Sequence, residues 1–505
     1  MVSEVSNLVR IVTSRAVSVL PLLDADKGES SKEQLFVATI KRTPEATQLQ
    51  LAKAVYGRAT AANLQALQKL QSRVRVKLLN QLYFLDHTDP RHLISRRYEL
   101  ECLALLHKVS VLYAERDFRL AERLLLHCLH LAETGEFTQY AVQAARMLRN
   151  LYVEQRKPVA YKKISEALQK AQQLLAWEDE AEQLQAGLQL AGNSTVAARR
   201  NLLTTLPGHL AQLETLHRKA HSFATYNALY RVRIIYEEMQ GHYTGLIRIT
   251  TAAERHLHEG KLNPRRFDLR FNHFMTIYAY LRSRQPVRGL LLAERYIRDF
   301  HPSSNNWFYF QEHYLLLALH AGRYELAQQL LDSVTKKLAF AGQREAALQR
   351  WDLYRSYINF VLPASRVLSA RQRQVAQQML LLPEYSRDKR GHNVAILVLQ
   401  LLHFLRERNL ELVLLRLERL RKYQQRHLTE ATTLRSRLFL RLLQVIAEKN
   451  FEPKKAVERG QNLLQQLRDT PPPGEAFAEV EIIPYENLWE IVLDLLREGP
   501  PVAAE

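Results

Sequence analysis

The stretch Gly322-Arg323-Tyr324-Glu325-Leu326-Ala327 is one copy of a short phrase that returns along the chain. Further copies read Arg116-Asp117-Phe118-Arg119-Leu120-Ala121, Gly241-His242-Tyr243-Thr244-Gly245-Leu246 and Lys449-Asn450-Phe451. Their aromatic residues lie 125, 81 and 127 positions apart, close to three, two and three units of about 41 residues. A period of this size is typical of stacked helix pairs, in which each unit buries its apolar face against its neighbours.

Helical spacing also dominates the sequence between these copies. Almost every window carries apolar residues at positions i, i+3, i+4 and i+7, as in Leu64, Leu67, Leu70, Val74 and Leu78. The 16 glycines and 17 prolines of the 505 residues leave few breaks in the backbone. We therefore predict an all-α fold built as a right-handed superhelical stack of antiparallel helix pairs.

The chain is too long for one compact core, since single cores stop growing near about 250–300 residues. We expect an N-terminal helical segment over residues 1–90 and the helical-repeat stack over 91–468. Three consecutive prolines predict a linker over 469–475, and 476–505 should hold a capping helix between Tyr485 and Arg497. Weaker units are expected near Lys162, Leu203, Gly289, Arg371 and Glu411.

Cysteine content and hydropathy limit the cellular context. Cys102 and Cys128 are the only cysteines, which excludes a disulfide framework and a four-cysteine zinc site. The N-terminus makes a poor signal peptide, with Arg10 and Arg15 inside its apolar segment. The longest uncharged stretch, 391–405, is shorter than the roughly 20 residues that span a bilayer, so we interpret it as a buried helix. We expect a cytoplasmic protein without a membrane partner.

The recurring phrase resembles the tetratricopeptide-repeat family in its broad sense. Gly322, Tyr324 and Ala327 match the turn and the small packing position of that family best, with Leu331 and Val334 at the following packing positions. The copy that runs from Asp117 through Phe118 and Ala121 to Leu125 and Cys128 matches nearly as well, although Arg116 replaces the glycine. The period is longer than the family's, and its tryptophan-leucine-glycine phrase is absent. The resemblance implies protein–protein binding in a concave groove.

Catalytic and metal-binding motifs are missing from the sequence. It contains no His-Glu-x-x-His phrase, no phosphate-binding Gly-x-x-x-x-Gly-Lys loop and no Gly-x-Gly-x-x-Gly loop. His127 and His130 share a helix face, but we interpret them as surface or groove histidines rather than as metal ligands. Cys128 falls where the repeat requires a small packing residue. We therefore expect no enzyme, no cofactor and no small-molecule substrate.

The sharpest local feature runs from Asn263 to Phe274, where Arg265, Arg266 and Arg270 alternate with phenylalanines. Arginines with aromatics can stack on bases and hold phosphates. The phenylalanines at 267, 271 and 274 also share one helix face, which favours a core with arginines at its rim. Asn272 belongs to a group of amides that could bind an extended peptide backbone.

The net charge of +19 is spread over most of the chain, but one region, which is a second candidate site, supplies a disproportionate +8 of it. Between Arg387 and Arg441 the sequence carries 13 basic and five acidic residues. Arg406 lies in this region, and Arg419, Lys422 and Arg426 form one helix stripe. The pattern fits an electropositive patch for an acidic protein or a nucleic acid, and equally a solvated helix face.

From these patterns we predict a non-catalytic helical-repeat scaffold that binds a protein or peptide, acidic in character, in a concave basic groove. The partner-binding candidates are the two arginine-rich sets above. The alternative is a nucleic-acid-binding protein that uses an arginine-rich patch on the stack.

Overall fold

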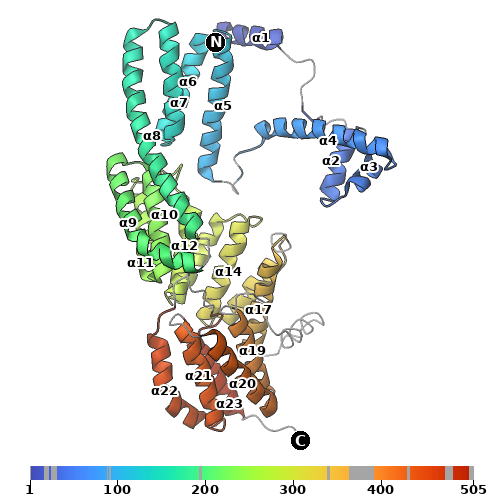
Figure 1. Cartoon of the computed structure of the whole chain (residues 1–505), viewed down its shortest axis with the longest axis vertical. Helices are drawn as coiled ribbons and strands as arrows, with labels where there is room; N and C mark the ends of the chain where they lie inside the picture. The colour runs from blue at the N-terminus through green and yellow to red at the C-terminus, as the bar shows by residue number, and fades with distance from the viewer. Residues whose placement is uncertain are drawn as a thin grey trace.

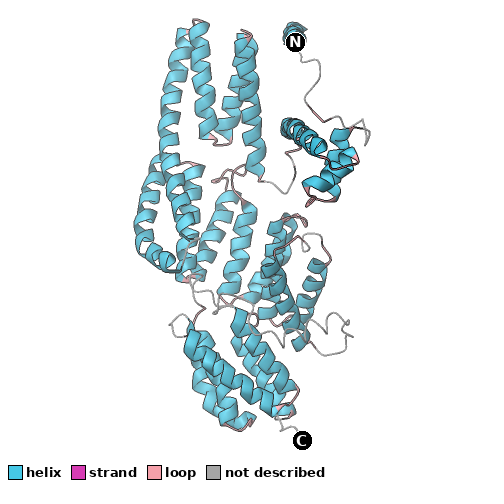
Figure 2. Ribbon diagram, turned by 45° about the vertical axis from the view of Figure 1, so that its right-hand side comes forward, coloured by secondary structure: helices cyan, strands magenta, loops and turns pink. Residues whose placement is uncertain are grey.

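The computed structural model describes residues 2–15, 22–23, 31–87, 89, 93–192, 196–337, 342–362, 392–428, 433–472 and 481–499. Throughout these ranges the regular structure is helical and contains no β-strand, which confirms the predicted all-α class (Figure 2). Most helices form one elongated column, with α5–α8 at one end and α19–α23 at the other (Figure 1). The small unit α2–α4 stands beside the column near its N-terminal end (Figure 1).

The small unit has a core of its own. Its helices are α2 (Lys32–Arg42), α3 (Gln48–Tyr56) and α4 (Ala61–Gln81), followed by the 3-10 turn η2 (Leu82–Phe84). They contact one another around a buried cluster that includes Phe36, Leu51 and Leu70. The preceding helix α1 (Val2–Arg15) places Ile11 in the core of the column instead.

The column consists of helices that contact their neighbours in chain order. They are α5 (Ile94–Ala114), α6 (Phe118–Thr134), α7 (Thr138–Glu154), α8 (Pro158–Gly192), α9 (Val196–Ala220), α10 (Phe223–Gln240), α11 (Tyr243–His258), α12 (Leu269–Arg282), α13 (Pro286–Tyr296) with η3 (Ile297–Asp299), α14 (Asn305–His320), α15 (Tyr324–Thr335), α17 (Glu345–Val361), α19 (His392–Arg406), α20 (Leu410–His427), α21 (Leu434–Glu448), α22 (Pro453–Asp469) and α23 (Tyr485–Glu498).

One type of turn joins the helices of the column. At nine helix ends in the described chain a residue with positive φ follows the last helical turn, and the next amide donates to the carbonyl five residues earlier, at 2.8–3.2 Å. In the first of these, Arg116 has φ 58° and the Asp117 amide bonds to the Leu112 carbonyl at 3.0 Å. This Schellman arrangement satisfies carbonyls that a helix end leaves without partners.

The recurring phrase marks only four of these nine turns. Glycine stands at the positive-φ position in three of the nine, and the other six hold Arg116, Glu136, Arg156, Arg284, Arg408 and Asn450. Several of the following helices begin with proline or leucine rather than with an aromatic residue. Three of the nine turns, at Arg156, Arg284 and Arg408, therefore contain neither a glycine nor an aromatic residue.

The spacing of the helices agrees with the predicted unit wherever the pairs are regular. The second helices of the pairs begin at Phe118, Pro158, Tyr243, Pro286, Tyr324, Leu410 and Pro453. The first residues of successive second helices lie 40, 43, 38 and 43 positions apart, except at two larger intervals. One of these holds the 35-residue helix α8 and α9, where α9 contacts both α8 and α10 and the simple pairing breaks down. The other includes residues 363–391, among them the predicted unit near Arg371, which lie outside the described residues.

The fourth position of these helices is small or β-branched and buried in five of the seven, whereas α8 has the exposed Tyr161 and α11 the buried Leu246 at that position. Ala121, Ala327, Val413 and Ala456 are fully buried there. Gly289 occupies the same position in α13, and a Cβ atom on it would lie 2.6 Å from Cδ2 of Leu317 in α14. The close approach of α13 and α14 therefore depends on the missing side chain.

The apolar core of the column falls into four clusters rather than one continuous seam. The largest extends from Ile277 to Leu496 and includes most apolar residues of the predicted buried helix, from Val394 to Leu405 of α19. Helix α12 lies between this cluster and the one before it, since Ile277 and Leu281 belong to the first and Met275 and Ala279 to the second.

The last helix, α23, lies where the sequence predicted a final amphipathic helix, and it contacts α19, α21 and α22. Its role as a cap stays a prediction. In the expected linker, Asp469 is the last residue of α22 and residues 473–475 lie outside the described chain.

We predict that Gly289→Ala destabilises the column by about 1–3 kcal/mol, because the added methyl group overpacks a buried contact with Leu317. Gly187→Ala in α8 is the matched control, since a Cβ atom there meets nothing within 4 Å. On helix propensity alone both changes should stabilise by up to about 1 kcal/mol. Thermal unfolding midpoints that rise for both variants would contradict the close packing.

Candidate functional site

A hollow of about 560 Å³, which we call the central groove, lies in the middle part of the column. Its walls come from α12, α14 and α17, and residues just before and within α23 close one side. The polar lining includes Arg282, Arg284, Glu312, His320, Arg350 and Glu481, with aromatic surface from Tyr278, Tyr309 and Tyr354.

Neighbouring helices of the central groove are joined by charge-assisted hydrogen bonds. Arg350 of α17 donates through Nε and Nη2 to the two carboxylate oxygens of Glu312 in α14, at 2.9 and 3.2 Å. The Tyr354 hydroxyl donates to the same carboxylate at 2.8 Å. On α12, Nε and Nη2 of Arg282 donate to the Tyr243 hydroxyl at 3.3 and 3.2 Å. These bonds fix the wall side chains in place before any partner arrives.

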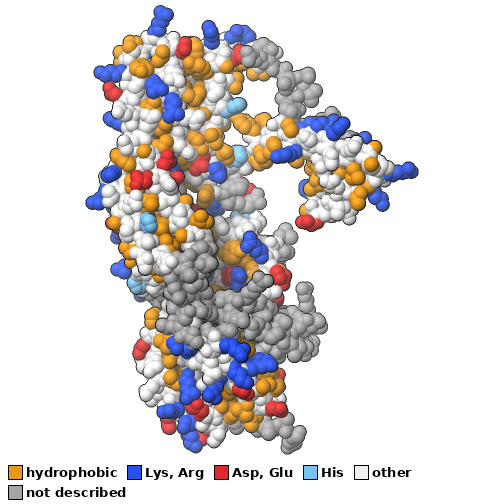
Figure 3. Space-filling model, viewed as in Figure 1, with side chains coloured by type: hydrophobic (Ala, Val, Ile, Leu, Met, Phe, Trp, Pro, Cys, Tyr) orange, Lys and Arg blue, Asp and Glu red, His pale blue; other side chains and the backbone are white. Residues whose placement is uncertain are grey.

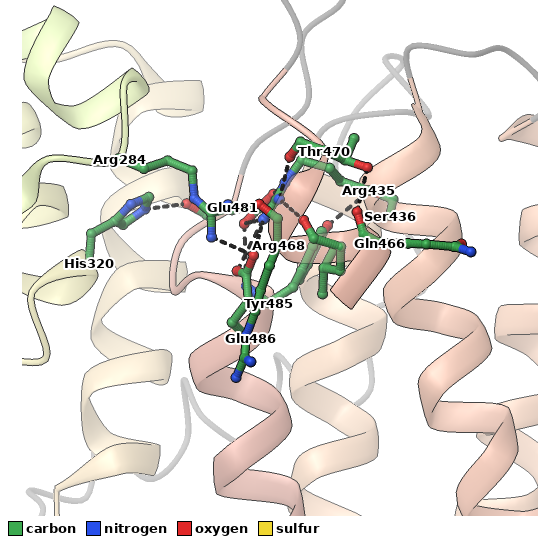
Figure 4. A network of polar contacts seen from close by, with 11 residues as sticks. Arg284, His320, Arg435, Ser436, Gln466, Arg468, Thr470, Glu481, Tyr485 and Glu486 are labelled. Atoms are coloured by element: carbon green, nitrogen blue, oxygen red, sulfur yellow. Dashed lines mark hydrogen bonds and ion pairs between the residues drawn. The ribbon is translucent and has the colours of Figure 1, made fainter. Parts of the chain in front are cut away.

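Arg435 holds the end of the groove together, as Figure 4 shows. This α21 side chain is 1% exposed, and its guanidinium donates to both oxygens of Glu481 at 2.5 and 3.0 Å. It also donates to Glu486 at 3.1 Å and to the backbone carbonyls of Leu467 and Thr470 at 2.6 and 2.8 Å. One buried arginine thus connects the end of α22 with the segment that enters α23.

The same network reaches back to the middle of the column. Arg284, in the turn after α12, forms an ion pair with Glu486 of α23 (Figure 4). The Nε2–H of His320 in α14 donates to the backbone carbonyl of Glu481 at 2.8 Å. The segment before α23 is therefore fixed against hairpins that lie 160 residues or more earlier in the chain.

Burial and the neighbouring charges set the ionisation of this network. Burial lowers the pKa of His320, against the hydrogen bond to the Glu481 carbonyl, so the ring is neutral at pH 7. Burial alone would raise the pKa of Glu481, but the hydrogen bonds and charge of Arg435 bring it below its ordinary value. Glu481 is thus an ionised carboxylate that is fully engaged within the chain.

A second hollow, of about 910 Å³, lies between α9, α10 and α11, and we call it the N-terminal groove. Tyr226 and Tyr230 of α10 stack with their ring centroids 6.0 Å apart, and His217 contacts Tyr226 edge to face. Burial raises the pKa of Tyr226 to about 12 and lowers that of His217. Arg233 is paired with Glu214 at 2.7 Å. This groove offers an aromatic wall with charged edges.

The arginine-rich stretch before α12 forms contacts within the chain. Arg266 lies over the rings of Phe137 and Phe223, at 4.7 and 5.1 Å, and donates to the Glu136 carbonyl. Arg265 lies 4.8 Å from the Tyr98 ring. The loop between α11 and α12 thus binds the turn between α6 and α7 and the start of α5.

The two remaining residues of that predicted set have different surroundings. Arg270 is half-buried and lines a hollow of about 430 Å³ together with Arg266 and Asp268. Asn272 is fully buried and accepts a hydrogen bond from the Tyr230 hydroxyl at 2.7 Å. Phe267 is buried, but it lies in the loop before α12, so it does not share a helix face with Phe271 and Phe274 as the sequence predicted. A partner would reach Asn272 only if α10 and α12 separated.

The second predicted set divides between an internal contact and an exposed face. Arg406 lies 3.7 Å from the Phe360 ring and donates to the Phe360 carbonyl at 2.5 Å. Arg419, Lys422 and Arg426 are exposed on α20 with Arg421, and Lys422 pairs with Glu418 at 2.7 Å. Figure 3 shows this concentration of basic side chains at the C-terminal end of the column.

Sequence reasoning missed the residues of the central groove. Arg435 was counted with the basic patch, yet it is buried in an ion-pair network. Its partners lie up to 51 positions away, and Glu312 and Arg350 are 38 positions apart, so no local motif joins them. The only sequence signal is the spacing of these pairs, which is close to one repeat unit.

The cysteines considered as catalytic candidates are buried, whereas His127 and His130 are exposed on α6. Cys102 and Cys128 are buried between α5 and α6, and the Cys128 thiol lies 3.8 Å from the Cys102 carbonyl oxygen. Within the described ranges no three His, Cys, Asp or Glu side chains are grouped so that they could hold a metal ion.

Comparisons with known proteins give no relative: no family model, no curated protein and no solved structure matches this chain. Among the described helices, none is both long and apolar enough to cross a bilayer.

We predict that Arg435→Met lowers the opening free energy of α21–α23 by about 3–5 kcal/mol, because it leaves the carboxylates of Glu481 and Glu486 buried without their main partner. Hydrogen exchange of the α21–α23 amides measures this energy. Arg441→Met is the control, since Arg441 is exposed on the same helix and should change stability by less than about 1 kcal/mol. Equal effects of the two substitutions would contradict the network.

Proposed function

We propose that this chain is a non-catalytic helical-repeat scaffold, a divergent relative of tetratricopeptide-repeat proteins that acts in the cytoplasm. The supporting observations are the recurring Schellman turn, the near-constant spacing of the hairpins and the contacts between hairpins in chain order. Units of this kind stack into a superhelix because each one contacts only its neighbours. On this proposal the hairpins continue as one right-handed stack.

On this proposal the partner-binding site is the central groove. The observation that carries the assignment is its lining by α12, α14 and α17 together with the segment that enters α23. Binding there requires no rearrangement of the walls, because Arg350, Glu312 and Tyr354 already hold one another. Three arginines, Arg282, Arg284 and Arg350, line the groove together with the carboxylates of Glu312 and Glu481. The groove's histidines include His320, which is neutral. We infer an acidic or carbonyl-rich segment of a protein as the ligand, with Tyr309 as an exposed aromatic contact.

The second candidate function is nucleic-acid binding on the exposed face of α20. The observation that favours it is the group of exposed cations Arg419, Arg421, Lys422 and Arg426. Leu414 and Leu415 are exposed beside them, and Glu411 and Glu418 reduce the local positive charge. The affinity for phosphates is highest where positive charge is not interrupted by acidic residues, so we place this candidate second.

We predict that Tyr309→Glu lowers the amount of a defined set of proteins that the full chain captures from native lysate, because the new carboxylate repels an acidic segment in the central groove. Quantitative mass spectrometry should show at least a tenfold loss, equivalent to about 1.4 kcal/mol of binding energy. Tyr161→Glu is the matched control, since Tyr161 is similarly exposed on α8 and lies outside both grooves.

Two results would count against the groove assignment. Capture that is the same for both tyrosine variants would place binding elsewhere. Capture that disappears after nuclease treatment, or with Arg419 and Arg426 both changed to Glu, would favour the nucleic-acid function instead.

A further inference from the structure

The end of helix α4 exposes more apolar surface than any function discussed so far requires. Seven large apolar side chains between positions 76 and 85 are exposed, and Phe84 is 70% exposed. They are Val76, Leu78, Leu79, Leu82, Tyr83, Phe84 and Leu85. Single exposed leucines are ordinary, but a contiguous group of this size is typical of an interaction site.

Part of this surface is concave. Leu78, Leu79 and Leu82 line a hollow of about 380 Å³ between α2 and α4, which we call the α4 groove. Its remaining lining residues are Phe36, Gln71, Val74 and Arg75. Phe36 and Val74 belong to the buried core of the small unit, so the floor of the groove is the core itself. The three helices α2–α4 thus leave open a position where a fourth helix would pack.

The surroundings of the α4 groove are strongly basic. Helix α4 carries Lys69, Arg73, Arg75 and Lys77 and no acidic residue. Residues 31–87 carry nine basic and three acidic side chains, a net charge of +6. Lys77 is paired with Glu33 of α2 at 2.7 Å, whereas Arg75 stands at the edge of the groove itself. Charge complementarity therefore requires a negatively charged occupant.

A bilayer fits these observations less well than a helix does. Apolar side chains insert into a bilayer when they protrude, but this apolar surface includes a concave floor. The Tyr83 ring also lies 6.4 Å from the His107 ring of α5, so the tip of α4 faces the column. A second copy of the chain fits less well again, because two units of charge +6 would meet at a symmetric interface.

We propose that the α4 groove binds a partner helix whose apolar stripe is flanked by acidic side chains. The stripe fills the hollow between α2 and α4, and an acidic residue at its edge pairs with Arg75. This site is separate from the central groove and does not depend on the function proposed for it.

The test uses the full chain and two synthetic helical peptides with leucines at i, i+3, i+4 and i+7. One peptide carries glutamates beside the leucines and the other carries lysines. We expect saturable binding of the glutamate peptide and at least tenfold weaker binding of the lysine peptide, measured by fluorescence anisotropy. Leu79→Glu should weaken the glutamate peptide at least tenfold, and Leu49→Glu, an equally exposed leucine of α3 outside the groove, should leave it within twofold.

Further variants separate this site from the alternatives. Arg75→Glu should reverse the preference between the two peptides, and Tyr309→Glu should leave it unchanged. Equal affinity for both peptides, or binding that Leu79→Glu does not affect, would overturn the proposal. Co-sedimentation with phosphatidylserine vesicles, or a dimer that Leu79→Glu dissociates, would assign the surface to a bilayer or a second copy instead.

Discussion

The arrangement of the column depends on how nine of its described helices end. A residue in the left-handed conformation reverses the chain, and two backbone hydrogen bonds satisfy the last carbonyls at the same point. The next helix must then run back along the one before it. Because a helix pair joined in this way exposes one apolar face on each side, it becomes stable only when further pairs cover those faces.

At six of the nine turns a residue other than glycine adopts the left-handed backbone conformation. That conformation costs roughly 1–2 kcal/mol for a residue with a Cβ atom. The packing on both sides must offset this cost. Arg284 shows one way in which it does, since its side chain forms an ion pair with Glu486 across the column. The strained turn and the long-range contact therefore occur at one residue.

The many arginines of this chain serve two different purposes. Arg266, Arg350 and Arg435 lie within the column and join helices that are far apart in sequence. Arg419, Arg421 and Arg426 remain exposed on α20. A count of charges along the sequence cannot separate the two groups, because exposure depends on which helices meet. The basic character of the chain is thus partly structural.

The fold was predictable from the sequence to the extent that it follows from local patterns. The 3.6-residue periodicity predicts the helices, and the phrase at Gly241 and Gly322 predicts turns that the structure confirms. The turn at Arg156 carries neither a glycine nor an aromatic residue, so nothing local distinguishes it. The 35-residue helix α8 also passes the point where a regular unit would turn.

The binding surfaces were less predictable than the fold. Phe267 is buried as predicted, but it precedes α12 and so shares no helix face with Phe271 and Phe274. Asn272 looked available for binding because a polar residue on an amphipathic helix is usually exposed, but α12 is covered on more than one side. The central groove combines residues from α12, α14 and α17 with residues from the chain's C-terminal part, which only the packed structure brings together.

The central claim is that consecutive hairpins lie side by side in chain order. Lys157, which precedes α8, lies 2.8 Å from the carboxylate of Glu122 in α6, so the first two hairpins touch there. Zero-length carbodiimide cross-linking of the full chain, followed by peptide mass spectrometry, tests this contact directly. The account predicts a Lys157–Glu122 amide bond. Coupling of Lys157 to a carboxylate of a distant hairpin in place of Glu122 would contradict it.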